Sequence, residues 1–384
     1  MEIKYLFSSP EGDISLRPED LARPFLITPS IHHPFLTLGD YFNAIRKFIL
    51  GDQGKRLLYI LKESLNREIG LDSIHKILIR SEKHGALYHV ASVDIFMYER
   101  PIKFAVTTAV SEEARACLTN EYEMLKSLNR SLRLPYLPEV YEKGDVKCQD
   151  GCNHHERLTL ILSEWFENYH EWHLSIDKND GKQKICIWDF QNGNRFASKE
   201  EASEIFRQAS KILTLYYDTK DFNQIYPWHH AAGDFVVKTG DDGIQVKLTT
   251  VRKYRPIMNS FSEEAVNPMI AMVYFFLNLT IRMRLDKLDG VGETAWAGDF
   301  SVHAATQGFF EAIRIMDGEG IFEPGYVQNL FLLLQSLNED EIERLLQPLL
   351  DLYQEDGPAD LPMIQANIKS HISFLCQALR ASRL

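Results

Sequence analysis

The chain has 384 residues, of which 45% are apolar and 25% are charged, and this predicts a globular protein with a large core in two or three structural units. Its formal net charge of -12 would repel a phosphate backbone, so nucleic acid is not an expected partner. Five cysteines favour a reducing compartment over a disulfide framework, and the longest apolar run is too short to span a bilayer, so we expect a cytoplasmic protein with no membrane partner.

The first predicted region covers residues 1–71. Residues 1 to about 36 contain scattered prolines and little periodicity, so we expect them to form an extended arm over the body of the protein. Apolar residues then recur at spacings of three and four in two stretches, residues 38–49 and 57–65, which predicts two short helices. We therefore expect an arm and a helical extension before the first sheet.

The second region, residues 72–167, is rich in β-branched residues. Three apolar or alternating runs predict an antiparallel meander, and Ser111 is placed to cap the helix that follows it. A further strand leads into a short aromatic and acidic stretch. The predicted strands are residues 74–80, 87–96, 102–110 and 158–163, and the predicted helix is residues 111–128.

The third region, residues 168–384, begins with a hairpin and then becomes mostly helical. The hairpin turns at Asn179-Asp180-Gly181, and Ser198 with Glu201 forms a capping-box pair that starts a helix with a broad apolar face. A second, smaller hairpin follows. The predicted strands are residues 172–176, 184–190, 235–238 and 244–249, and the predicted helices are residues 198–216, 263–286, 301–316, 325–337, 339–354 and 362–381.

The order of these elements resembles that of the protein kinase and aminoglycoside phosphotransferase superfamily. Residues 120–128 resemble the αC helix of that family, and residues 160–167 resemble its final small-lobe strand and hinge. The resemblance covers roughly residues 72–290. It implies an α+β chain with a bilobal protein kinase-like fold, in which residues 72–167 form a small antiparallel-sheet N-lobe up to the hinge and residues 168–384 form a large helical C-lobe with a small hairpin near residues 235–249.

Glu121 is the first candidate site residue. Its apolar neighbours at helical spacing place it on the buried face of the predicted helix, where an ionised carboxylate is costly unless a cation pairs with it. The resemblance implies a partner lysine on the third strand that also holds nucleotide phosphates, but Thr107 stands at that position. Lys103, four residues earlier, is the nearest basic residue. The alternative interpretation is that Glu121 is a half-exposed helix carboxylate.

Residues 227–238 resemble the catalytic loop of the family. His229 stands at the position of the aspartate base, and Asp234 stands at the position of the metal-binding asparagine five residues later. The next strand should end in a second metal-binding aspartate, but Thr249 stands there. Threonine supplies neither a cation nor a strong anionic ligand, so we expect very low ordinary kinase activity. The resemblance implies a cleft bounded by Thr107, Glu121, Glu164 at the hinge, His229, Asp234 and Thr249.

Other interpretations of the same loop stay open. A rearranged phosphotransferase would use His229 as a base and Asp234 as a metal ligand. His229 and His230, with Asp234 four residues after His230, also match part of the motif of chloramphenicol acetyltransferase-like and condensation-type acyltransferases, in which His230 would be the base. The structural interpretation is that both histidines are hydrogen-bonded in a packed loop.

Two further clusters carry possible ligands. Four residues within a short stretch have side chains that zinc prefers, and this predicts a structural zinc site; the alternative is a polar surface loop with reduced thiols. These residues are Cys148, Cys152, His154 and His155. Arg252, Lys253 and Arg255 follow the second small hairpin, where they would bind an anion or pair with carboxylates.

The sequence therefore predicts a pseudokinase-like protein that binds a ligand or a partner and has little ordinary phosphotransfer activity. The alternative is a small-molecule phosphotransferase with a rearranged site. The resemblance implies a nucleotide with a divalent metal as the cofactors to test, and the partner is either a small molecule or a protein.

Overall fold

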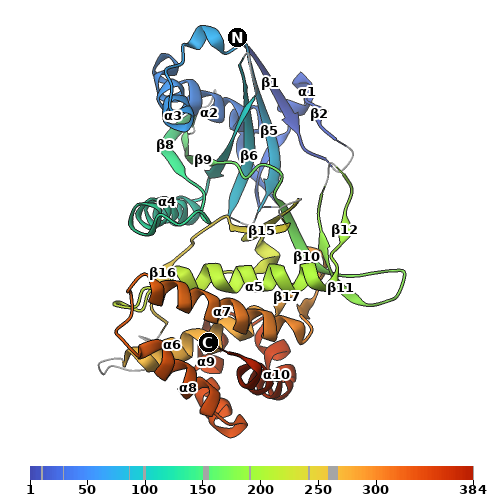
Figure 1. The fold of residues 1–384 in the computed structure, drawn as a ribbon. Helices are drawn as coiled ribbons and strands as arrows, with labels where there is room; N and C mark the ends of the chain where they lie inside the picture. The colour runs from blue at the N-terminus through green and yellow to red at the C-terminus, as the bar shows by residue number, and fades with distance from the viewer. Residues whose placement is uncertain are drawn as a thin grey trace. The chain divides into compact units, whose positions relative to one another are not determined.

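The computed structural model describes residues 1–9, 12–28, 30–85, 87–97, 101–149, 155–189, 192–240, 243–257 and 267–383. The chain forms two compact units, unit 1 from Met1 to Glu167 and unit 2 from Asn168 to Leu384 (Figure 1). Helices and strands occur in both units and the sheets are mostly antiparallel, which confirms the predicted α+β class. None of the helices in the described part of the chain is both long enough and apolar enough to cross a membrane.

Unit 1 is built on a seven-stranded sheet with the strand order β2-β1-β5-β6-β7-β9-β8. β1 runs parallel to β5, and the other neighbouring strands in this sheet pair in antiparallel fashion. The predicted meander is confirmed as β5, β6 and β7. The strands are β1 (Glu2–Phe7), β2 (Ile14–Ser15), β5 (Lys76–His84), β6 (Tyr88–Phe96), β7 (Ile102–Ala109), β8 (Val140–Gln149) and β9 (His155–Glu164).

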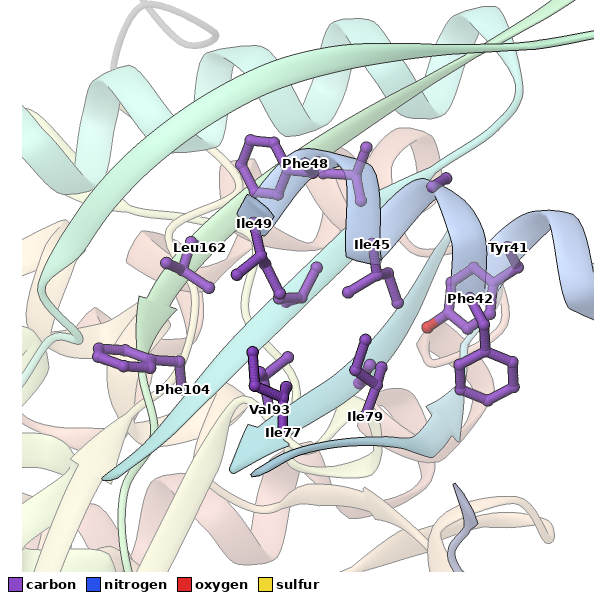
Figure 2. Packing of buried hydrophobic residues seen from close by; sticks show 14 of the residues in the cluster. Tyr41, Phe42, Ile45, Phe48, Ile49, Ile77, Ile79, Val93, Phe104 and Leu162 are labelled. Atoms are coloured by element: carbon purple, nitrogen blue, oxygen red, sulfur yellow. The ribbon is translucent and has the colours of Figure 1, made fainter. Parts of the chain in front are cut away.

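The main hydrophobic core of unit 1 lies between this sheet and two helices. The side chains of α2 point at alternate residues of the strands, as Figure 2 shows for Ile45 above Ile79 and for Ile49 above Val93. Each fully buried aliphatic or aromatic side chain of this kind contributes about 1.5–3 kcal/mol. The other elements of unit 1 are α1 (Pro18–Leu21), β3 (Pro24–Thr28), β4 (Ile31–Thr37), α2 (Leu38–Leu50), η1 (Asp52–Gly54), α3 (Lys55–Leu65), η2 (Leu71–Ser73) and α4 (Glu112–Leu132).

The segment predicted to be an extended arm is not one. It contains β1, which extends the sheet beside β5, and the β3–β4 hairpin. Pro18 is the first residue of α1 and Pro24 is the first residue of β3, positions at which the missing N–H costs little. Tyr5 of β1 stacks on Phe42 of α2 at 4.9 Å between ring centres, so this segment belongs to the core of unit 1.

Two further predictions for unit 1 need correction: β8 was not predicted, and α4 is longer than the predicted helix 111–128. Ser111 caps α4 as predicted, accepting the Ala114 N–H at 3.1 Å, but the helix continues to Leu132. β8 lies at the edge of the sheet and pairs only with β9 in the described part of the chain. Its charged residues Glu142, Lys143 and Lys147 hide the alternation by which a strand is recognised, and charge of this kind protects an edge from unwanted pairing.

Unit 2 contains a five-stranded sheet with the order β12-β11-β10-β14-β15. Both predicted hairpins are present, as β10–β11 and β14–β15. Two residue pairs, His170 with Val237 and Glu171 with Val236, join β10 to β14. The strands of unit 2 are β10 (His170–Ile176), β11 (Gln183–Ile187), β12 (Arg195–Phe196), β13 (Gln224–Ile225), β14 (Phe235–Gly240), β15 (Gly243–Leu248), β16 (Tyr254–Arg255), β17 (Leu285–Lys287) and β18 (Thr294–Trp296).

The helices of unit 2 confirm the predicted series with one correction. The predicted helix 263–286 is too long. The observed helix ends at Arg282, and the last residues of the predicted range belong to β17, which pairs with β18. Residues 263–266 lie outside the described residues. The Arg284 guanidinium holds this end by donating to the Ala297 carbonyl at 2.7 and 2.9 Å. The helices are α5 (Lys199–Leu215), η3 (His230–Ala232), α6 (Pro268–Arg282), η5 (Leu288–Gly290), α7 (Phe300–Gly318), α8 (Tyr326–Ser336), α9 (Glu339–Asp356) and α10 (Leu361–Ala381).

The pair α5 and α7 packs unusually closely, and small residues make this possible (Figure 1). A Cβ added at Gly308 of α7 would lie 2.0 Å from the Arg207 carbonyl oxygen of α5. Ser210 of α5 donates its hydroxyl to the Ala305 carbonyl of α7 at 2.6 Å. The two helices therefore touch through their backbones, and this pair supports the β14–β15 hairpin through the Gln208 side chain, which donates to the Ile244 carbonyl at 2.6 Å.

Candidate functional site

The loop that resembles a catalytic loop lies in unit 2 between β13 and β14. A single turn of η3 follows His229, and Gly233 takes a positive φ of 70° to turn the chain into β14. His229 is the N-cap of this turn, since its Nδ1 accepts the Ala231 N–H at 3.1 Å. The short turn and the strand place Asp234 at the base of the loop.

Asp234 is held by an arginine from the segment after β15. Its side chain is 1% exposed, and its two carboxylate oxygens each accept an N–H of the Arg252 guanidinium at 2.5 Å. Oδ2 also accepts the backbone N–H of His229 at 2.8 Å. This arrangement is a bidentate, charge-assisted pair, the strongest type of hydrogen-bonded ion contact in proteins. The predicted pairing of the basic residues with carboxylates is confirmed for Arg252.

A second carboxylate, Asp360, lies next to the His229 ring. Its Oδ2 is 3.7 Å from His229 Nε2 and accepts an N–H of Arg282 at 3.1 Å. Burial works to raise the pKa of Asp360, but the adjacent His229 imidazole and the Arg282 guanidinium outweigh burial and hold that pKa below its usual value. Arg282 also donates to the Trp228 carbonyl at 3.0 Å, which ties α6 to the loop. We call these five residues, His229, Asp234, Arg252, Arg282 and Asp360, the Asp234 cluster.

The contacts of His229 define its tautomer. Because Nδ1 accepts a backbone N–H, the proton of the neutral ring is on Nε2, facing Asp360. The lone pair that a general base needs is therefore already used by the Ala231 N–H. To act as a base, His229 would first have to release that hydrogen bond, at a cost of about 1 kcal/mol.

His230 faces the interior of unit 2. The residue is 2% exposed, its Nε2–H donates to the Met283 carbonyl at 3.2 Å, and its ring lies 4.4 Å from the centre of the Trp172 ring. Burial lowers the pKa of His230 to about 3. These contacts match the structural interpretation of this residue. They argue against the acyltransferase interpretation, because a substrate cannot reach a base that is enclosed by aromatic rings.

Thr249 closes the other side of the loop. Its backbone N–H donates to the Asp234 carbonyl at 2.7 Å, and its hydroxyl donates to the Gly233 carbonyl at 3.1 Å. The predicted residues His229, Asp234 and Thr249 therefore do lie together in unit 2. The position to which the resemblance assigns a second acidic ligand therefore holds a neutral hydroxyl, which bonds the backbone of the loop.

The candidate residues of unit 1 lie on two neighbouring strands of the sheet, β7 and β9, and on the helix α4. Thr107 is half-buried on β7, between Val90 of β6 and Ile161 of β9. Glu121 is buried on α4, which confirms the predicted buried face. Glu164 ends β9 and accepts the Glu139 N–H at 3.2 Å. That these residues and those of unit 2 line one cleft stays a prediction.

Lys103, the basic residue nearest to the position at which the resemblance implies a lysine, has its own set of partners. Its Nζ is 3.6 Å from Glu82 Oε1 and 4.1 Å from the centre of the Trp165 ring. Glu82 is also 3.6 Å from Arg80, whose guanidinium donates to Asp94 at 3.1 Å. The ammonium of Lys103 is therefore neutralised within a charged network on β5, β6 and β7, and this network is a structural alternative to a phosphate clamp.

The predicted zinc site is only partly within the described residues. Cys148 is buried near the end of β8 and His155 is exposed at the start of β9, whereas Cys152 and His154 lie outside the described residues. Burial raises the pKa of the Cys148 thiol, which opposes the thiolate form that binds zinc. Within the described part of the chain, no group of three or more His, Cys, Asp and Glu residues could hold a metal ion.

Sequence reasoning missed two members of the Asp234 cluster. Arg282 ends a strongly apolar helix, and Asp360 precedes another helix by one residue, so neither carries a local pattern that indicates a site. A buried arginine in an apolar helix is a weak signal that a carboxylate lies nearby. Neither a scan against protein-family models nor a search of curated proteins finds a match to the chain, so these comparisons assign no role to the residues of the Asp234 cluster.

Proposed function

We propose that the chain is a pseudokinase-like protein with a kinase-like bilobal fold, which binds a ligand or a protein partner and has little ordinary phosphotransfer activity. The order of elements supports this proposal, since unit 1 contains an antiparallel meander, the helix α4 and the strands β8 and β9, and unit 2 contains the loop, the β14–β15 hairpin and then mostly helices. The motif resemblances around Glu121 and His229 support it as well.

The observation that carries the proposal is that Thr249 is uncharged and that its hydroxyl is bonded to the backbone of the loop. Phosphoryl transfer needs metal-bound and cationic groups that offset the charge on the transferred phosphate. Thr249 brings no charge, and its hydroxyl already donates to the Gly233 carbonyl. Thr107 likewise brings no cation, so two of the groups that would offset that charge are missing from the positions that the resemblance assigns to them.

One observation favours the alternative of a rearranged phosphotransferase. His229 lies 3.7 Å from Asp360, a geometry in which a carboxylate orients an imidazole, and 19% of its side chain is exposed. Against it stands the hydrogen bond from Ala231 to Nδ1, which takes the lone pair that the reaction would need. The alternative therefore requires His229 to release this hydrogen bond before it can act as a base.

A ligand screen with a transfer assay tests the proposal. The full chain is melted with ATP, ADP and AMP, each with and without Mg²⁺ or Mn²⁺, because any species that binds the folded state raises the melting temperature by mass action. Transfer from labelled ATP is measured in parallel. We expect rates at least about a thousandfold below the 1–100 s⁻¹ of ordinary kinases.

Two variants assign any residual activity. His229→Gln removes the candidate base, and His32→Gln changes an exposed histidine of unit 1 and serves as the control. Transfer at ordinary kinase rates would sink the proposal. Metal-dependent stabilisation by ATP, with slow transfer that is lost in His229→Gln and kept in His32→Gln, would establish the rearranged enzyme instead.

A further inference from the structure

The contacts of Asp234 show which cation neutralises it. A carboxylate that is 1% exposed must have a counter-ion, since a buried, uncompensated charge is strongly destabilising. Both of its oxygens accept N–H groups of Arg252 at 2.5 Å. The counter-ion of Asp234 is therefore a side chain of this protein.

The remaining groups around Asp234 do not fit a divalent metal. Mg²⁺ requires near-octahedral oxygen ligands at about 2.0–2.1 Å, with carboxylates and water as the usual donors. The Thr249 hydroxyl is turned toward the Gly233 carbonyl, and the second carboxylate, Asp360, is paired with Arg282. The Asp234 cluster thus contains two carboxylates and two guanidinium groups, and its charges already balance.

We propose that Arg252 takes the place of a divalent cation at Asp234, so that this site excludes divalent metals as long as Arg252 is present. The inference deepens the proposed function, on which it rests for the view that Asp234 occupies a metal-binding position. Its physical basis is independent, because a guanidinium and a metal ion cannot occupy the same two carboxylate oxygens. Removing Arg252 leaves a buried carboxylate without its counter-ion, so this carboxylate accepts another cation from solution.

The experiment uses Mn²⁺ alone as the probe. Free Mn²⁺ is measured by electron paramagnetic resonance during titration of the full chain, with no nucleotide present. We expect no saturable binding at Asp234 in the unchanged protein up to about 5 mM, and one site with a Kd of about 1 mM or tighter in Arg252→Ala, in the range of weak oxygen-ligand sites. The expected gain in affinity is at least about tenfold, which corresponds to about 1.4 kcal/mol.

Three control variants test whether the new Mn²⁺ site is at Asp234 and whether the positive charge of residue 252 prevents its formation. Arg252→Lys keeps a cation beside Asp234 and should bind no Mn²⁺. Arg255→Ala removes a nearby, 42% exposed arginine that pairs with Asp356 instead, and it should also bind none. The double variant Arg252→Ala with Asp234→Asn should lose the new site. Circular dichroism establishes that each variant is folded, and Arg252→Gln, which can still donate a hydrogen bond to Asp234, replaces Arg252→Ala if the latter does not fold.

Two results would overturn the inference. The first is saturable Mn²⁺ binding by the unchanged protein that is lost in Asp234→Asn. The second is a folded Arg252→Ala or Arg252→Gln variant that gains no Mn²⁺ affinity. Because the titration contains no nucleotide, either result leaves the transfer assay untouched, and kinase-rate transfer would sink the proposed function whether or not Mn²⁺ binds.

Discussion

The core of unit 1 and the Asp234 cluster of unit 2 are both buried, but they are held together by different physics. In the core, α2 packs Phe42, Ile45 and Ile49 on the sheet through contacts that are individually weak and have no preferred direction. In the Asp234 cluster, a few charged groups meet in fixed geometry through directed hydrogen bonds and ion pairs. The core should therefore respond to the volume of packed side chain that a substitution removes, and the cluster to the charge that a substitution leaves unpaired.

The largest effect is expected where the core loses an aromatic ring. Phe42 is fully buried, and its ring stacks on Tyr5. Phe42→Ala removes this packing and leaves a cavity, so we expect the free energy of unfolding of unit 1 to fall by about 3–5 kcal/mol. Denaturant unfolding followed by far-ultraviolet circular dichroism measures it.

The control for this prediction is Tyr59→Ala on α3, whose side chain is 59% exposed. Its effect should stay within about 0.5 kcal/mol, as for most surface positions. A loss in Phe42→Ala no larger than that of Tyr59→Ala would contradict the assignment of α2 to the core and would place the stability of unit 1 elsewhere.

Fold and site differ in how far the sequence predicts them. The helices of unit 2 and the strands β5, β6 and β7 were predicted, because an element that buries one face has apolar residues at regular spacings along its own sequence. The strand β1 was missed because it lies in a segment with scattered prolines and little periodicity, and β8 was missed because many of its residues are charged. For the Asp234 cluster, His229 and Asp234 carry a motif, whereas Asp360 reaches the loop only through the packing of the start of α10.

The second prediction measures the asymmetry of the Asp234–Arg252 pair. Asp234 is 1% exposed and Arg252 is 29% exposed, so loss of the arginine strands a buried charge, whereas loss of the carboxylate leaves a guanidinium that can be hydrated. We expect Arg252→Ala to cost about 3 kcal/mol. Asp234→Asn, which keeps the shape and one acceptor, should cost about 1–2 kcal/mol. Unfolding of unit 2 in denaturant at pH 7 gives both values.

A double variant gives the corresponding control. Replacing both residues by neutral side chains removes the stranded charge, so the loss in Arg252→Ala with Asp234→Asn should be smaller than the sum of the two single losses. Additive losses would mean that the two side chains do not interact, and the cluster would then be an arrangement of surface charges.

The third prediction concerns acid. Burial lowers the pKa of His89, His230 and His371 to about 3, far below the value of the unfolded chain, about 6.5. The unfolded state therefore binds more protons, and stability is present above pH 6.5 and falls as pH decreases below it. Each histidine should remove about 2 kcal/mol between pH 7 and pH 5. His371→Leu should reduce the pH dependence of unit 2 by this amount.

His173 gives the opposite sign and so serves as the control. Burial works to lower its pKa, but the carboxylates of Asp286 and Glu171 outweigh burial and raise it. Its contribution is therefore present in full below the pKa of the unfolded chain and is lost as pH rises through the folded-state pKa. His173→Gln should cost more stability at pH 6 than at pH 9. Equal losses at the two pH values would show that His173 is held by packing and not by charge.

The smallest effect is expected where the sequence alone defined the contact. Ser198 accepts the Glu201 N–H at 3.1 Å and Glu201 accepts the Ser198 N–H at 2.8 Å, which is the capping box that the sequence predicted. Ser198→Ala should cost about 1 kcal/mol, while Ser198→Asp should keep the cap and cost only a few tenths. Because α5 carries the close contact with α7, a loss of several kcal/mol in Ser198→Ala would mean that fraying of the first turn spreads into that contact, and that a local signal and a tertiary one are coupled in unit 2.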